Sequence, residues 1–290
     1  MPASALGTTT FRKFLRDSHL LLVCSVAALA LLAFSACSSA QTSPALQPVS
    51  ASRADAPRAD SANTIVIGFL GGHVDHANPH HIEVQLANKL RDEFGAGVDV
   101  ETFENRRYTE AYDRILTLLG SNRDGRLSSD EKRRARIILY GHSWGAAAVV
   151  ALARELESSG IPVRLTVQVD SIPHFGQDDS VIPANVAKAA NFYQSQGTFR
   201  GEPAIKPADP AHTQILGNFR FDYSSSTFVC EGFPWWDRYF MKAHTEIECD
   251  PKVWSQVENL IRAELPPATA TVAIPAVASN PPGAAAYAKP

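Results

Sequence analysis

The sequence predicts an α/β fold, in which a mainly parallel central sheet carries helices on both faces. Three observations lead to this prediction. Strand-like apolar segments alternate with segments of helical period, and this alternation implies right-handed crossovers between parallel strands. The chain has 290 residues, 45% of them apolar, which suits one such domain with additional segments. The pentapeptide at residues 141–145, GHSWG, joins a strand-like segment to a helix-like one.

The first elements follow from their local patterns. Residues 64–70 form a continuous apolar run, which indicates a buried strand. Residues 81–94 and 108–119 place apolar side chains at helical spacing, and residues 98–103 between them alternate as a strand does. The order strand, helix, strand, helix is the repeating unit of a parallel sheet.

The later elements continue this order. Residues 135–140 are β-branched and apolar, and the alanine-rich residues 146–156 predict a helix behind the pentapeptide. Residues 163–169 predict the next strand. Beyond it we expect a helix over 184–193, a strand over 213–221 and a closing helix over 250–265, with Asp250 as N-cap and Pro251 in first position.

The termini predict export and tethering. Residues 1–36 combine basic side chains with about fifteen apolar residues, a length that fits a secretory signal better than a membrane span. Small residues before Cys37 resemble a bacterial lipobox, in which lipidation of Cys37 would anchor the protein to a membrane; ordinary cleavage nearby is the alternative. Residues 37–63 predict a flexible linker and residues 266–290 a disordered Pro/Ala-rich tail, leaving a folded domain at 64–265. We therefore expect a location in the bacterial cell envelope or secretion.

Charge and cysteine content narrow the class of protein. The net charge is −3 and no basic block occurs, so we expect no nucleic-acid partner. Cys24 lies in the apolar N-terminal run, and Cys37 is the candidate lipidation site. Only Cys230 and Cys249 therefore lie in the expected folded domain. In an exported chain these two can form a disulfide, and two buried thiols are the alternative.

The GHSWG turn predicts a nucleophilic serine. A strand-to-helix turn forces Ser143 into strained backbone geometry and projects its hydroxyl clear of the sheet. The serine needs a general base, and the base needs an orienting acid. Asp170 directly follows the strand after the turn, and His244 lies in a late loop before the closing helix, so we predict a Ser143–His244–Asp170 triad. The rivals are His212 as base and, as acids, Asp178, Asp179 and Asp222.

Two N–H groups are expected to bind the oxyanion that develops during acyl transfer. We predict the backbone N–H of Trp144 as one, and that of Leu70 or Gly71, in the loop after the first strand, as the other. The same loop holds four histidines, for which no cysteine or adjacent carboxylate set completes a zinc site, so we expect an active-site rim and no metal: His73, His76, His80 and His81. We expect His142 to serve in packing or support, and the aromatic residues at 228–241 to line either a pocket or the core.

With the turn, the glycine loop, Asp170 and His244 in this order, residues 64–265 resemble the α/β-hydrolase superfamily. The resemblance implies the superfamily's sheet, esterase-like chemistry and no cofactor, with Ser143 as nucleophile. Many members carry the acid one strand later; an acid at Asp170 looks more like the pancreatic-lipase branch. The resemblance also places a small lid within 171–211.

The sequence therefore predicts a serine hydrolase that cleaves carboxylic esters, lipid esters included, through an acyl-enzyme. The same triad also cleaves thioesters and amides, so these substrate classes are alternatives. A protein of the cell envelope that binds ligands without turning them over is the alternative from another class, since one fold supports both.

Overall fold

The computed structural model describes residues 64–122, 126–174, 176–226 and 229–267. Residues 1–63, with the expected signal, linker and Cys37, lie outside the described residues, as do residues 268–290 of the expected tail. The elements in chain order are β1 (Thr64–Leu70), α1 (Ile82–Phe94), the 3₁₀ helix η1 (Gly95–Gly97), β2 (Asp99–Glu104), the 3₁₀ helix η2 (Asn105–Arg107), α2 (Tyr108–Leu119), α3 (Ser129–Arg134), β3 (Arg136–His142), α4 (Trp144–Ser158), β4 (Val163–Val169), β5 (Val181–Ile182), β6 (Val186–Gln194), β7 (Lys206–Pro207), β8 (Gln214–Phe221), α5 (Trp235–Phe240), α6 (Lys242–Cys249) and α7 (Pro251–Glu264).

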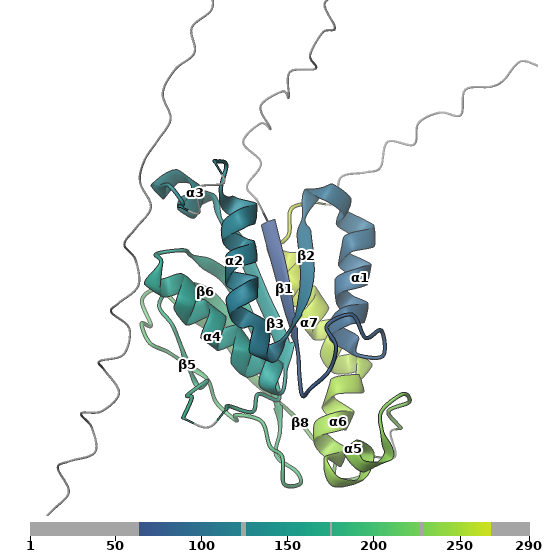
Figure 1. Ribbon diagram of the computed structural model, residues 1–290. Coiled ribbons are helices and arrows are strands. Elements are labelled where there is room, and N and C mark those ends of the chain that lie inside the picture. Colours follow the sequence, from purple (N-terminus) through teal and green to yellow (C-terminus); the bar gives the residue numbers. More distant parts are fainter. Residues whose placement is uncertain (1–63, 123–125, 175, 227–228, 268–290) are drawn as a thin grey trace, which may run out of the picture. The chain divides into compact units, whose positions relative to one another are not determined.

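Six strands form one sheet in the order β2-β1-β3-β4-β6-β8, and every neighbouring pair is parallel (Figure 1). The predicted parallel sheet is therefore confirmed. Parallel pairing brings the carboxyl ends of all six strands to the same edge. The central strands β1, β3 and β4 end there at Leu70, His142 and Val169, next to the residues predicted to act. A separate small sheet pairs β5 with β7.

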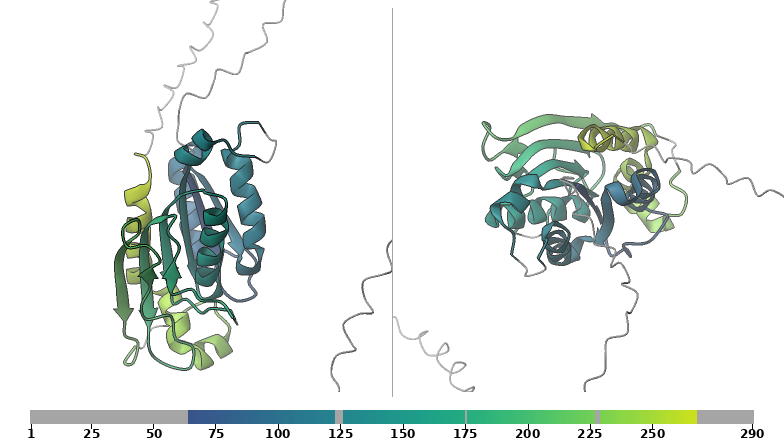
Figure 2. Two further views of the ribbon diagram at one scale, coloured as in Figure 1. Left: turned by 90° about the vertical axis from the view of Figure 1, so that its left-hand side faces the viewer. Right: turned by 90° about the horizontal axis from the view of Figure 1, so that it is seen from above.

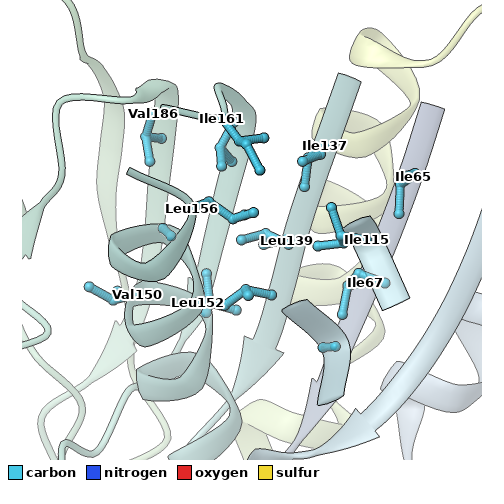
Figure 3. Packing of buried hydrophobic residues seen from close by; sticks show 14 of the residues in the cluster. Ile65, Ile67, Ile115, Ile137, Leu139, Val150, Leu152, Leu156, Ile161 and Val186 are labelled. Carbon is cyan, nitrogen blue, oxygen red and sulfur yellow. The ribbon is translucent and has the colours of Figure 1, made fainter. Parts of the chain in front are cut away.

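Helices cover both faces of the sheet, as predicted: α2 and α4 pack on one face, and α1 and α7 on the other (Figure 2). Alternate residues of each strand enter the two cores, because successive side chains of a strand point to opposite faces. Figure 3 shows Ile65, Ile67, Ile137 and Leu139 directed toward α4, whereas Val66, Ile138 and Tyr140 belong to the core under α1 and α7. These two cores make the strand ends a rigid base for loops.

Helix α7 begins as the sequence predicts. The Asp250 carboxylate accepts a hydrogen bond from the backbone N–H of Lys252 at 2.8 Å, and Pro251 occupies the first turn, where its missing N–H costs nothing. The helix packs Val253, Val257 and Ile261 against the sheet. Within the described ranges, no helix combines the length and apolarity that crossing a membrane requires.

The helix expected over 184–193 is wrong, because this segment is strand β6. Its alanines favour a helix locally, but tertiary packing decides the conformation of a segment that lies between two strands. Ala189 faces the core under α4, and Ala190 faces the core under α7. Both are fully buried, so the small side chains serve close packing on the two faces of a strand that has a neighbour on each side.

The segment 171–211, in which a small lid was expected, includes three strands. That segment supplies β6 to the main sheet and both strands of the small sheet. Both this segment and the one around α5 line the cavity at the candidate site: Ile172 and Phe199 come from 171–211, and Phe233, Trp236 and Met241 come from the part of the chain around α5. The middle of 171–211 is strand β6 between β4 and β8, so the residues of this segment that line the cavity come from the two sides of this strand.

Candidate active site

Ser143 occupies the sharp turn between β3 and α4. Its backbone angles are φ 57° and ψ −126°, a conformation that L-residues rarely adopt. Among the described residues, Ser143 and Asp170 are the two non-glycine residues with positive φ. Strain of this kind persists only where surrounding contacts impose it, and it concentrates at functional sites. The Ser143 N–H donates to the Val169 carbonyl at 3.0 Å, which joins the turn to β4.

The glycines on either side of Ser143 make the turn possible. A Cβ at Gly145 would collide with the Phe69 carbonyl, and one at Gly141 would lie 2.7 Å from the Gly145 carbonyl. Real Cβ atoms do not approach backbone so closely, so both positions require glycine. Helix α4 consequently begins directly against β1 and β3, with its N-terminus beside the serine.

Ser143, His244 and Asp170 form a hydrogen-bonded chain. Ser143 Oγ lies 2.8 Å from His244 Nε2, and His244 Nδ1 lies 2.6 Å from Asp170 Oδ2. Asp170 is fully buried and His244 is nearly so. His244 comes from helix α6, not from the loop in which we expected it. The structure thus brings the three predicted residues together from the ends of β3 and β4 and from a late helix.

Asp170 is held as a hydrogen-bond acceptor from several directions. Besides His244, it accepts from the Gln194 N–H at 3.1 Å, the Gln194 side-chain amide at 2.8 Å and the Gly201 N–H at 2.8 Å. Sequence reasoning did not single out Gln194, although it ends the next strand, β6, where many α/β-hydrolases carry the acid. Here that position holds a neutral amide that supports the acid one strand earlier.

The serine turn, the all-parallel sheet and the chain order Ser, Asp, His at its carboxyl edge decide the fold assignment. The fold is that of an α/β-hydrolase. No protein-family model and no curated protein matches the sequence. The assignment therefore stands on the topology and on the geometry of the turn.

Solved structures with distant likeness include two esterases and a thioesterase by their titles. The chain is similar to a hyperthermophilic esterase from the archaeon Pyrobaculum calidifontis, with 10% identity and a TM-score of 0.38 over 72% of this chain and 78% of that one. It is similar to the RedJ thioesterase of prodiginine biosynthesis in Streptomyces coelicolor, with 13% identity and a TM-score of 0.37 over 76% and 97%. It is also similar to an acetyl xylan esterase, with 11% identity and a TM-score of 0.35 over 70% of this chain and 98% of that one.

The loop after β1 lies against the serine, as an oxyanion-binding loop in an α/β-hydrolase would. A Cβ at Gly71 would stand 2.9 Å from Ser143 Cβ, so only glycine fits there. Trp144 is the first residue of α4, and its N–H has no acceptor within the helix. The buried Asn105 amide donates to the carbonyls of Leu70 at 3.1 Å and Gly72 at 2.5 Å, which fixes the backbone around Gly71. Nothing in the sequence singled out Asn105.

A cavity of about 750 Å³ opens at Ser143 and His244. Of the aromatic segment at 228–241, Phe233, Trp236 and Met241 line this cavity. Trp235, Tyr239 and Phe240 are exposed and do not line it, Trp236 is itself 52% exposed, and Phe228 lies outside the described residues. The expectation that this segment lines a pocket therefore holds for Phe233, Trp236 and Met241. The exposed residues do not belong to the core.

Next to the triad lies a second group of ionisable side chains, His142, Glu248, His81 and Glu83. His142 Nδ1 is 3.2 Å from Glu248 Oε2, and His81 Nδ1 is 2.5 Å from Glu248 Oε1. Burial alone would raise the pKa of Glu248, but the two imidazoles lower it. Burial alone would lower the pKa of His142, but Glu248 raises it to about 9. Burial and the Glu248 charge raise the pKa of Glu83.

The histidines of the glycine loop separate in the structure. His73 stacks edge-on against Trp144, and His81 turns to Glu248, which lies 167 positions away in the sequence. The expectation that no carboxylate set stands beside this cluster was wrong, because Glu83 and Glu248 both lie next to His81.

The rival triad residues lie elsewhere. His212 is exposed and pairs with Asp209 at 2.6 Å. Asp178 accepts from Ser180, and Asp179 accepts from Ser171. Asp222 accepts from Ser224. Each of these side chains is therefore bonded to residues outside the triad.

Cys230 and Cys249 are joined by a disulfide, with their Cα atoms 5.9 Å apart. Cys249 is the last residue of α6, so the bridge ties the helix that carries His244 to the segment after β8.

Proposed function

We propose that the protein is a serine hydrolase that cleaves carboxylic esters through an acyl-enzyme. The observation that carries the proposal is the buried chain from Ser143 Oγ through His244 to Asp170, with separations of 2.8 and 2.6 Å. These are hydrogen-bond distances, and the three groups are those that general-base activation of a hydroxyl needs.

Each group has one task in this reaction. His244 Nε2 takes the proton of Ser143 as Oγ attacks the acyl carbonyl, and Asp170 holds the imidazole and stabilises its charged form. The N–H groups of Trp144 and of Leu70 or Gly71 bind the oxyanion. His244 then gives the proton to the leaving alkoxide, and water releases the acid by the same steps.

The cavity supports an ester with an apolar portion. Phe233, Trp236, Met241 and Phe199 contribute apolar walls, while His73 and Asn78 contribute polar groups. Such a pocket buries an acyl or alkyl chain and uses a few polar groups to orient the ester. Fatty-acyl and aryl esters of graded length are therefore the first substrates to test.

A fluorophosphonate probe tests the serine directly, because it reacts only with an activated hydroxyl. We expect the purified protein to be labelled and to hydrolyse p-nitrophenyl esters, and Ser143→Ala to abolish both. Ser171→Ala is the matched control, since Ser171 is also buried near a carboxylate but bonds to Asp179 instead of a histidine. Absence of labelling under conditions that label a control esterase would contradict the proposal and favour a non-catalytic binding protein.

We also propose export with lipidation of Cys37, supported by the basic and apolar N-terminal residues 1–36 and the small residues before Cys37. Cells supplied with an alkyne fatty acid should label the wild-type protein but not Cys37→Ser. Equal labelling of both would contradict lipidation at this residue.

A further inference from the structure

His81, Glu83 and Glu248 form a cluster of metal-ligand groups beside the triad. Each offers one nitrogen or oxygen atom, and these atoms all lie within 4.8 Å of one another. The residues come from two distant parts of the chain. His81 and Glu83 stand at the start of α1, and Glu248 stands near the end of α6.

Glu83 provides an independent sign that a cation belongs here. Its side chain is fully buried, and neither carboxylate oxygen has a hydrogen-bond partner. Tyr140, the nearby hydroxyl, donates to the backbone carbonyl of Glu83 and not to its carboxylate. A buried carboxylate without donors is strongly unfavourable, and it occurs stably where it is paired or coordinates a metal.

We propose that His81, Glu83 and Glu248 bind a divalent transition-metal ion, and zinc by preference. An imidazole nitrogen with two carboxylate oxygens is a donor set that zinc uses, whereas calcium and magnesium select oxygen ligands. A tetrahedral ion with bonds of about 2.1 Å places its ligand atoms about 3.4 Å apart. Small rotations of three side chains therefore close the site, with the His81–Glu248 hydrogen bond giving way to two metal bonds.

The site has an entry path and an outer support. His81, His142 and Glu248 all line the 750 Å³ cavity, so an ion reaches the ligands from solvent. His142 stands 3.2 Å from the Glu248 oxygen that is not bonded to His81, and it orients that carboxylate. A bound ion then supplies the partner that both oxygens of the buried Glu83 carboxyl group lack.

The ion would act as a tether. Glu248 lies four residues after His244 on α6, one helical turn along the same face. Coordination joins this helix to the start of α1, and through His142 to the end of β3. The proposal concerns binding and stability, so it stands or falls independently of the hydrolytic function.

Zinc titration of the chelator-treated full-length protein tests the site. Isothermal titration calorimetry should show one zinc bound per chain, and the melting temperature should rise with zinc concentration, because zinc binds only the folded site. Glu83→Gln keeps the shape of the side chain, and it should weaken zinc binding at least 100-fold and remove the thermal shift. His81→Ala, at the less buried edge of the cluster, should do the same if Glu83→Gln fails to fold.

The cluster of Asp75, His76 and Glu104, which is more exposed, supplies a matched control, because it also gathers three ligand atoms within 4.8 Å. Glu104→Gln should leave the zinc affinity and thermal shift unchanged. Wild-type protein without zinc binding, cluster variants that keep it, or loss in Glu104→Gln would each overturn the proposal. An equal thermal shift with Mg²⁺ or Ca²⁺ would overturn the assignment to a transition metal.

Discussion

Asp170 and Glu83 are both fully buried carboxylates, but hydrogen-bond donors surround only one of them. Asp170 accepts from His244, from the Gly201 N–H and from two groups of Gln194. Glu83 accepts from none. The two groups have the same chemistry and the same exposure, so the difference lies in what the fold brings to each.

The backbone explains this difference. Asp170 sits at the carboxyl end of a central strand, in a strained conformation with φ 44°, where the N–H groups of neighbouring segments converge. Glu83 sits in the first turn of α1, which suits a negative charge, but its oxygens do not cap the helix. Asp170 is thus held by donors in the position that orients a histidine, whereas Glu83 lacks such donors and, in our proposal, is completed by a cation.

The largest expected effect concerns Asp170, the carboxylate that is surrounded by donors. Asp170→Asn should lower kcat for ester hydrolysis on the order of 10⁴-fold, because an amide does not stabilise the imidazolium or hold its tautomer. Steady-state kinetics with a p-nitrophenyl ester measures the loss. Asp179→Asn is the control, since Asp179 is a buried carboxylate that bonds to Ser171. A loss below tenfold at Asp170 would show that another group serves as the acid.

The next effect concerns the helix that both regions share, since α6 carries His244 and Glu248. Replacing Cys230 and Cys249 together by serine removes a bridge across 19 positions and should lower the free energy of unfolding by about 3 kcal/mol. Urea denaturation under oxidising conditions measures it, and the wild-type protein with reductant should match the double variant. Equal stability of oxidised wild type and variant would mean that α6 is held by its packing alone.

The same isosteric change at the two carboxylates should alter stability in opposite directions. In chelator-treated protein at pH 8, above the pKa that burial raises to about 7, Glu83→Gln should raise the free energy of unfolding by about 2 kcal/mol, because it removes a buried charge without donors. Asp170→Asn should lower it by about 2 kcal/mol, because its amide N–H would face other donors. Urea denaturation of both variants measures the two changes in the free energy of unfolding. If both changes have the same sign, the fold does not treat the two carboxylates differently.

Local pattern predicted most of the sheet and the residues at its edge. Each of the four strands expected before Asp170 is formed, because strands of the sheet leave either a continuous apolar run or an alternation of apolar and polar residues in the sequence. Ser143, Asp170 and His244 were found because strand ends and chain order place them. The alanine-rich β6 escaped prediction, since its conformation is imposed by β4 and β8 on either side.

The second group of ionisable residues escaped prediction for a different reason. The pairing of His81 with Glu248 joins positions 167 residues apart, and no periodicity in either segment points to the other. Asn105 likewise acts through its side-chain amide on the distant backbone of Leu70, and Gln194 through its amide on the Asp170 carboxylate, and neither contact leaves a pattern in the sequence. Contacts of this kind arise from the packing of α1 and α6 and of neighbouring strand ends.

The smallest expected effect distinguishes the side-chain donor to Asp170 from its backbone donors. Gln194→Ala removes one of the donors to Asp170 and keeps the backbone N–H of residue 194, so kcat should fall about tenfold, the equivalent of one charge-assisted hydrogen bond. Gln196→Ala is the matched control, because the Gln196 amide bonds to Asp222 at the surface. A loss at Gln194 as large as that of Asp170→Asn would mean that the amide is essential for the position of the acid. No loss would mean that the backbone N–H groups of residues 194 and 201 suffice, and that strand geometry alone makes Asp170 different from Glu83.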